Sequence, residues 1–135
     1  GAGFSSLSLC GITPTPFHPK VKKTALGAEL SVPWEHSWDV CETVSQMKKT
    51  GTEIWALEGG DRSIDIFDST RFLDHETRSI ALVVGNEVSG VDPEVVKMCD
   101  HCVYIPMEGC KESLNVAIAF GIAAYLIRYG VRIHE

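Results

Sequence analysis

Three glycine-containing turns, each placed after an apolar run, hold the residues best suited to bind a small molecule. They are ALEGG (56–60), VGNEVSG (84–90) and IPMEGCKESLN (105–115). Glycine lets the backbone approach a ligand closely, and exposed main-chain amides and carbonyls can hold a nucleoside without a charged side chain. Any one of these turns alone is better explained as an ordinary strand-to-helix connection. Together they predict one binding site.

Two common nucleotide-binding patterns are not met. GNEVSG (85–90) has the glycine spacing of a phosphate-binding P-loop but lacks the Lys and Ser/Thr that follow it there, and the sequence contains no G-x-G-x-x-G. ATP and dinucleotide chemistry are therefore poorly supported.

The stretch CDHC (99–102) raises the question of a metal or redox site. One C-x-x-C without a matching second pair is a weak signal for zinc. Strand alternation makes Cys102 an inward residue, and Cys99 is expected to finish a helix. We interpret both thiols as packing residues and predict no metal site.

A local basic cluster, Lys20, Lys22 and Lys23, stands out in a chain with a net charge of -6. The acidic balance argues against broad affinity for nucleic acid, which comes from Lys and Arg neutralising phosphates. The cluster is a candidate RNA contact, although a solvated helix face explains it equally well. The three tryptophans (Trp34, Trp38, Trp55) are expected to fill the core rather than to stack on bases.

The elements that must position these turns alternate between short apolar runs and helical stretches, which predicts an α/β fold with a mostly parallel sheet. At 135 residues, of which 44% are hydrophobic, the chain is expected to form one domain. Strands are predicted at 5–11, 52–60 with its exit loop, 79–86 and 102–106. Helices are predicted at 20–29 after Pro19, at 37–51 with Ser37 as cap, after Asp92 with Pro93 first, and at 113–130. Residues 61–78 are expected to be loop with at most one short element.

Composition also suggests where the protein works. Five cysteines, an odd number, do not resemble a secreted disulfide framework. No apolar run approaches the roughly 20 residues of a membrane span, and the N-terminus lacks the pattern of a signal peptide. We expect reduced thiols, no membrane association and a cytoplasmic location, with an organelle matrix as the alternative.

Longer motifs carry a resemblance to a known family. LVVGNEVSGVDPE (82–94), CDHCVYIPMEG (99–109) and ESLNVAIAFGIAAYLIR (112–128) resemble the second and third signature motifs of the SPOUT superfamily. Specifically, they are similar to its SpoU/TrmH branch of RNA ribose 2'-O-methyltransferases. CGITPTPFHPKVKKTALGAELSVPW (10–34) also resembles the segment that precedes these motifs in many bacterial and organellar members. The likeness covers residues 3–130.

The resemblance implies a fold that composition cannot suggest. It implies a parallel α/β sheet flanked by helices, whose C-terminal segment threads through a loop to make a deep trefoil knot, a rare exception among proteins. It further implies that the knotted loops bind S-adenosylmethionine in a bent form, that no metal is required, and that two subunits pair as a homodimer.

Site residues are carried over by the same resemblance. Contacts to the cofactor, largely through main chain, are implied for Leu57, Glu58, Gly59, Gly85, Asn86, Gly90, Ile105, Met107 and Leu114. Gly85 would let the backbone close on the cofactor, while Asn86 and Glu87 would shape the pocket and face the RNA. Glu87, Ser113 and Asn115 are the implied catalytic residues, the last two orienting the ribose hydroxyl and the methyl donor.

The family's first motif, a strand followed by an Asn and a helix bearing an Arg, normally precedes the stretch that corresponds to GFSSLSLCG (3–11), and this sequence begins at Gly1. We therefore expect residues 1–135 to form a single methyltransferase domain without its N-terminal strand and first motif. The leading hypothesis is S-adenosylmethionine-dependent methyl transfer to the ribose 2'-hydroxyl of a tRNA or rRNA nucleotide. The alternative is a catalytically inactive SPOUT module that binds cofactor or RNA. A third interpretation, a flavodoxin-like domain unrelated to SPOUT, would require an unknotted C-terminal helix.

Overall fold

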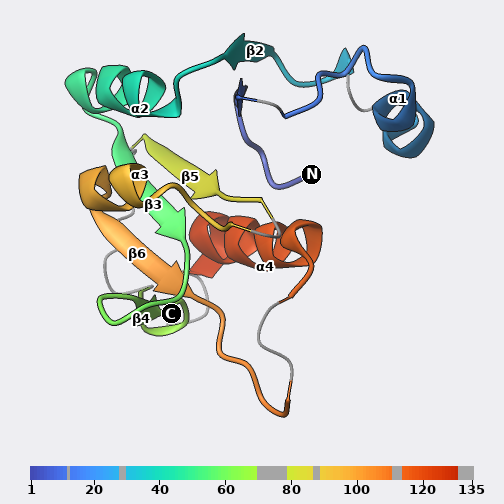
Figure 1. Cartoon of the computed structure of the whole chain (residues 1–135). Coiled ribbons are helices and arrows are strands. Elements are labelled where there is room, and N and C mark those ends of the chain that lie inside the picture. Colours follow the sequence, from blue (N-terminus) through green and yellow to red (C-terminus); the bar gives the residue numbers. More distant parts are fainter. Residues whose placement is uncertain (12, 28–29, 70–78, 87–88, 111–113, 131–135) are drawn as a thin grey trace. The chain divides into compact units, whose positions relative to one another are not determined.

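The computed structural model describes residues 1–11, 13–27, 30–69, 79–86, 89–110 and 114–130 (Figure 1). Its contacts divide the chain into two compact units. One unit is Gly1 with Gly3–Thr43, and the other is Ala2 with Val44–Glu135. The single-domain organisation stays a prediction.

The first unit contains a small parallel sheet. Strand β1 (Leu7–Cys10) pairs with β2 (Trp34–Ser37), with Leu7 opposite Trp34 and Cys10 opposite Ser37. The first strand was predicted, but β2 was not, because its sequence WEHS shows no apolar run. Helix α1 (Pro19–Ala25) begins at Pro19, as predicted from the fixed φ of proline.

Helix α2 (Val40–Lys49) begins later than predicted. The carboxylate of Asp39, rather than the hydroxyl of Ser37, caps it, because Asp39 Oδ1 accepts hydrogen bonds from the N–H groups of Cys41 (3.0 Å) and Glu42 (3.2 Å). Ser37 is instead the last residue of β2. The prediction of Ser37 as the cap was therefore wrong.

The second unit contains a four-stranded sheet in the order β4-β6-β3-β5. Its strands are β3 (Glu53–Leu57), β4 (Ile64–Asp65), β5 (Ile80–Val84) and β6 (His101–Tyr104), and every pairing is parallel. The parallel α/β prediction is thereby confirmed. Because parallel strands share a direction, the carboxyl ends of β6, β3 and β5 lie at one edge of this sheet.

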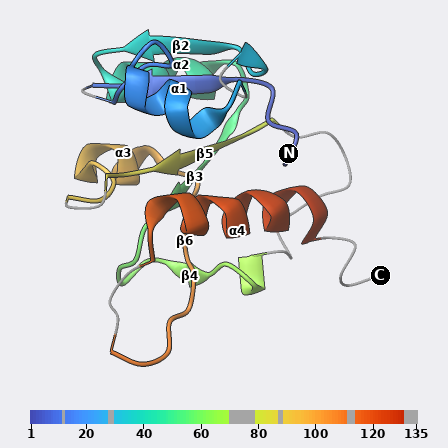
Figure 2. The same ribbon diagram turned by 90° about the vertical axis from the view of Figure 1, so that its right-hand side faces the viewer.

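Helices α3 (Pro93–Met98) and α4 (Val116–Tyr129) lie on opposite sides of this sheet (Figure 1). Figure 2 shows α4 running across the strands. Asp92 caps α3 and Pro93 is its first residue, as predicted. Helix α4 was predicted over 113–130 and its first helical residue is Val116. Within the described ranges, no helix is both long enough and apolar enough to cross a membrane.

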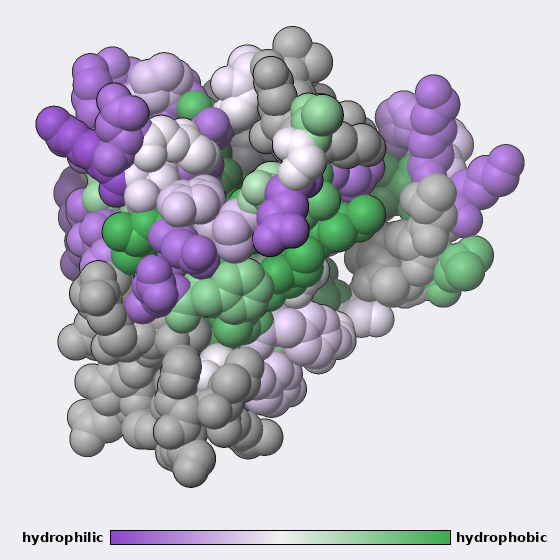
Figure 3. All heavy atoms as spheres, turned by 90° about the horizontal axis from the view of Figure 1, so that it is seen from below, coloured by the Kyte–Doolittle hydropathy of each residue, from purple (hydrophilic) through white to green (hydrophobic). Residues whose placement is uncertain are grey.

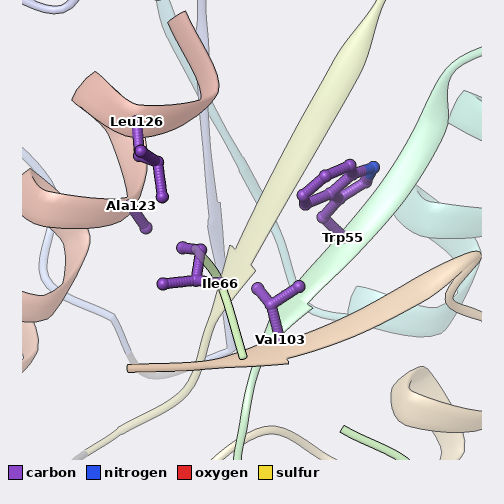
Figure 4. Close-up of a cluster of buried hydrophobic side chains, with 5 residues drawn as sticks. All are labelled: Trp55, Ile66, Val103, Ala123 and Leu126. Atoms are coloured by element: carbon purple, nitrogen blue, oxygen red, sulfur yellow. The ribbon is translucent and has the colours of Figure 1, made fainter. Parts of the chain in front are cut away.

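A cluster of buried side chains fixes α4 to the sheet (Figure 4). The cluster consists of Trp55 of β3, Val103 of β6, Ile66 after β4, and Ala123 and Leu126 of α4. All except Leu126 are fully buried, and Leu126 is 8% exposed. Trp55 therefore fills the core, as predicted.

Trp38 does not fill the core. Its side chain is 79% exposed, and its ring makes an edge contact with the ring of His36 at 4.7 Å between centroids. It lies between β2 and α2, outside the regular elements whose alternation suggested burial. The prediction of a core role for Trp38 was wrong.

The two tryptophans make a matched pair for a stability test. Trp55→Ala is expected to lower the free energy of unfolding by about 3–5 kcal/mol, because it empties a fully buried site. Trp38→Ala is expected to change it by no more than about 0.5 kcal/mol. Urea denaturation followed by circular dichroism measures both, and equal effects would contradict the assigned core.

Candidate functional site

The exits of β3, β5 and β6 line one cavity of about 890 Å³ in the second unit. This volume lies within the roughly 300–1,000 Å³ of small-molecule sites in proteins. The lining combines glycine-containing backbone with apolar side chains. The lining residues are Leu57, Glu58, Gly59, Gly60, Ser63, Val84, Gly85, Asn86, Ser89, Gly90, Tyr104, Ile105, Met107, Leu114, Asn115, Val116 and Ala119.

The structure brings the three predicted turns together. Ten residues singled out from the sequence lie around this cavity: Leu57, Glu58, Gly59, Gly85, Asn86, Gly90, Ile105, Met107, Leu114 and Asn115. Their convergence follows from strand order, because β6, β3 and β5 are neighbours and their carboxyl ends meet at one edge. The individual roles assigned to these residues stay predictions.

Five other predicted residues are not placed at the cavity. Glu87 and Ser113 lie outside the described residues. Lys20, Lys22 and Lys23 lie on α1 in the first unit, where Lys20 and Lys23 are exposed. The side chain of Lys22 also lies outside the described part of the chain. RNA contact by these lysines stays a prediction.

Sequence reasoning missed two polar side chains at the cavity. Ser63 follows the β3 exit, and its hydroxyl donates a hydrogen bond to the carbonyl of Glu58 at 2.6 Å. Tyr104 is the last residue of β6. The position of Ser63 depends on the two-residue strand β4 and its pairing with β6, which 61–78 did not signal because that segment has no sustained period. Tyr104 lies in the strand predicted at 102–106, but no role was assigned to it. Gly60, Val84 and Ser89 belong to the predicted turns 56–60 and 84–90 but were not singled out as site residues, and Val116 and Ala119 complete the lining.

The turn after β5 is closed by its own hydrogen bonds. Asn86 Oδ1 accepts from the N–H of Ser89 at 2.7 Å, and the carbonyl of Asn86 accepts from the N–H of Gly90 at 3.0 Å. Gly90 has a φ of +70°, a conformation that favours glycine. The side chain of Asn86 thus shapes the turn after β5 through an Asx-type hydrogen bond.

Gly85 is required by the same turn. A Cβ on Gly85 would overlap the backbone of Gly90 and Val91. The glycine was predicted to let backbone close on a ligand, and the structure shows that it lets the turn close on itself.

Asn115 is the N-cap of α4. Its Oδ1 accepts a hydrogen bond from the N–H of Ala117 at 2.8 Å, which leaves the side-chain Nδ2 without a partner among the described residues. The positive end of the 14-residue helix therefore faces the cavity together with one amide donor.

The thiols of the C-x-x-C pair have properties of packing residues. Burial, with a smaller contribution from nearby Cys102, raises the pKa of Cys99 to about 11. Burial also raises the pKa of Cys102, and the charge of Glu58 adds to the increase. Raised pKa values disfavour the thiolate that metals and electrophiles require. The described residues contain no group of three or more potential metal ligands.

Comparison with known proteins identifies the family. The model of the SpoU rRNA Methylase family matches residues 1–125. The chain belongs to this family. The resemblance to the SpoU/TrmH branch noted in the sequence is thereby confirmed.

Curated proteins similar to this chain share about a third of the aligned residues with it. The tRNA (guanosine(18)-2'-O)-methyltransferase of Aquifex aeolicus is 34% identical over 116 residues, which cover 81% of this chain and 52% of that protein. The 23S rRNA (guanosine(2553)-2'-O)-methyltransferase RlmP of Bacillus subtilis is 31% identical over 129 residues, covering 94% of this chain and 48% of that protein. The chain thus spans about half the length of these relatives.

A solved structure of the family shows the same fold. The SpoU methyltransferase AviRb of Streptomyces viridochromogenes, in complex with the cofactor AdoMet, superposes with a TM-score of 0.81 at 25% identity. The match covers 99% of this chain and 52% of that one.

Glycine substitutions test the geometry of the cavity. Gly85→Ala is expected to lower the free energy of unfolding by more than about 3 kcal/mol, because the added methyl group overlaps backbone that cannot move aside. Gly59→Ala is the control in the same cavity, since nothing lies within 4 Å of its added Cβ. Its expected effect is within about 0.5 kcal/mol. Thermal and urea denaturation compare the two, and similar losses would show that the β5 turn is not the tight closure described.

Proposed function

We propose that the cavity binds S-adenosylmethionine and that the protein methylates the ribose 2'-hydroxyl of a tRNA or rRNA nucleotide. The observation that carries this proposal is the convergence of the three turns on one nucleoside-sized cavity in a member of the SpoU rRNA Methylase family. The names of the curated relatives support the reaction, and the AdoMet complex of AviRb supports the cofactor.

The residues present fit this cofactor. The cavity offers apolar side chains for an adenine, including Leu57, Ile105 and Leu114, beside exposed main-chain groups of glycine-containing turns. No Lys or Arg is among the described lining residues, so no cationic side chain there would neutralise a phosphate. Such a lining suits an adenosyl group that carries a sulfonium.

The protein's task is alignment rather than activation of a leaving group. When bound, S-adenosylmethionine supplies a methyl group that its sulfonium already activates. Asn115 Nδ2 and the positive end of α4 are placed at the cavity, where they orient the ribose oxygen and stabilise negative charge that develops on it. Glu87 and Ser113 keep their proposed roles on the strength of the family motifs.

The trefoil knot is part of the same proposal. Strand β6 lies between β4 and β3, both of which precede it in the chain, and α4 then packs against the sheet. This order is compatible with a C-terminal segment that threads through an earlier loop. Mechanical unfolding under reducing conditions tests the knot. A fully stretched chain that is shorter than its contour length would support it, because a tightened knot keeps part of the chain from extending.

Asn115 provides the sharpest test of the reaction. Asn115→Ala removes both the cap and the amide donor, whereas Asn115→Ser keeps a side chain that caps helices well. Both variants are expected to lose at least about tenfold in methyl transfer, roughly 1.4 kcal/mol, with cofactor affinity changed much less. The measurement is transfer of a tritiated methyl group to total RNA by the full-length protein, with calorimetry for cofactor binding.

The outcomes separate the candidate functions. Wild-type activity in Asn115→Ser would show that the residue acts only as a cap, and equal losses of rate and affinity would make it a pocket wall. Cofactor binding by a full-length protein that methylates no RNA would favour the inactive binding module.

A homodimer is also proposed, with α4 as its contact surface. Ile118, Ile122, Tyr125 and Tyr129 recur at helical spacing, and their side chains are 57%, 37%, 51% and 37% exposed. A band of hydrophobic residues crosses the middle of the face shown in Figure 3. Exposed apolar patches commonly mark interaction surfaces, and a second copy of α4 would bury this stripe.

Charge placed on the stripe is expected to disrupt the dimer. Tyr125→Asp should shift the full-length protein to the mass of one chain in light scattering, because a carboxylate cannot be buried in an apolar contact without a partner. Phe67→Asp is the control, since Phe67 is 51% exposed but lies outside α4. A dimer that survives Tyr125→Asp, or a monomeric wild type, would contradict the proposed surface.

A further inference from the structure

Glu58, the first residue after β3, is held in place by its backbone. Its N–H donates a hydrogen bond to the carbonyl of Val103 in β6 at 3.0 Å. Its carbonyl accepts the hydroxyl of Ser63 at 2.6 Å. The start of the Glu58 side chain is thus fixed relative to β6 and to the loop that precedes β4.

From there the side chain crosses to the turn after β5. Glu58 Oε2 accepts a hydrogen bond from the N–H of Val91 at 2.6 Å, a short distance that is typical of a charged acceptor. Val91 is only 5% exposed, so water cannot easily replace the Glu58 carboxylate as the acceptor of its N–H. A conformation in which a buried N–H has no acceptor is destabilised.

The carboxylate also occupies the space beside Gly90. A Cβ built on Gly90 would lie 2.5 Å from Glu58 Oε2 and 3.0 Å from Oε1. Glycine is therefore required there for two independent reasons, its φ of +70° and the presence of this carboxylate. The side chain and the glycine fit one another closely.

The connection joins two of the three turns that line the cavity. The turn after β5 is closed by bonds of Asn86 to Ser89 and Gly90, and these bonds lie within the turn itself. The Glu58 carboxylate links that closed turn to the end of β3. Resemblance to the family accounts for Glu58 as a main-chain contact, and it assigns no role to this carboxylate.

We propose that Glu58 is a positioning residue, whose carboxylate clips the β5 turn to the β3 exit and so sets the width of the cavity between them. It acts through Val91 and Gly90, without contact to the reacting atoms. This inference rests on the proposed function for its consequence in cofactor binding, while the clip itself is a property of the apoprotein.

The test uses the full-length protein and two replacements of Glu58. Glu58→Ala removes the acceptor, whereas Glu58→Gln keeps an amide oxygen that can accept from Val91 without the charge. Glu58→Ala is expected to weaken S-adenosylmethionine binding at least about tenfold and to raise its KM, with kcat at saturating cofactor within about threefold of wild type. Glu58→Gln is expected to stay within about threefold of wild type in affinity. Glu108→Ala, which removes an exposed carboxylate in the β6 exit, is the control and should bind normally.

A double-mutant cycle tests the clip without any ligand. Gly90→Ala should lower the melting temperature more in the wild-type background than in the Glu58→Ala background, because the smaller side chain removes one of its two sources of strain. Additive effects would overturn the proposed contact. This readout does not depend on methyl transfer.

The remaining outcomes are equally decisive. If Glu58→Gln is as impaired as Glu58→Ala, the charge rather than the hydrogen bond acts, and the clip is rejected. Unchanged cofactor affinity in Glu58→Ala also rejects it. Loss of kcat with an unchanged KM would make Glu58 a catalytic residue. If the wild type binds no cofactor but the cycle is non-additive, the proposed function fails and the clip stands.

Discussion

Parallel pairing of β3 with β5 on one side and β6 on the other is the constraint on which the site depends. Trp55 lies opposite Leu82 of β5 and opposite His101 of β6. Because all three strands run the same way, their exits meet at one edge, and this brings the three turns that line the cavity together. A slip of one residue would move an exit by about 3.3 Å and would turn Trp55 out of the core.

Polar groups at the opposite edge help to fix that register. The carboxylate of Asp100, just before β6, accepts the N–H of Ile54 at 2.7 Å. Glu53 Oε1 accepts the indole N–H of Trp55 at 2.8 Å and lies 3.1 Å from His101 Nε2. The contacts of Ile54 with Asp100 and of Glu53 with His101 connect β3 to β6 and the residue before it, at the end remote from the cavity. The sheet is therefore held by directed polar contacts at one edge and left open for a ligand at the other.

The sequence was most informative where local chemistry and global fold agree. Apolar runs bounded by glycine identified three of the four strand exits in the second unit, and Asp92 with Pro93 identified the start of α3. It failed where a tertiary contact decides the outcome: WEHS (34–37) becomes a strand only by pairing with β1, and Ser63 reaches the cavity only because β4 pairs with β6. The knot, the dimer and the cytoplasmic location depend on chain threading, on a second copy and on the cell, so they stay predictions.

Helix α4 is about 21 Å long, and three different parts of it have different roles. Its first turn borders the cavity through Asn115, its buried face fills the core through Ala123, and its outer face presents Tyr125. Ala123 has no exposed surface, so a bulkier residue there must displace α4 from the sheet. Because a helix does not bend easily, displacement of α4 at Ala123 also displaces Asn115. A screen for defective variants would then recover changes of interior alanines that mimic damage at the cavity end of α4, although they lie two turns further along the helix.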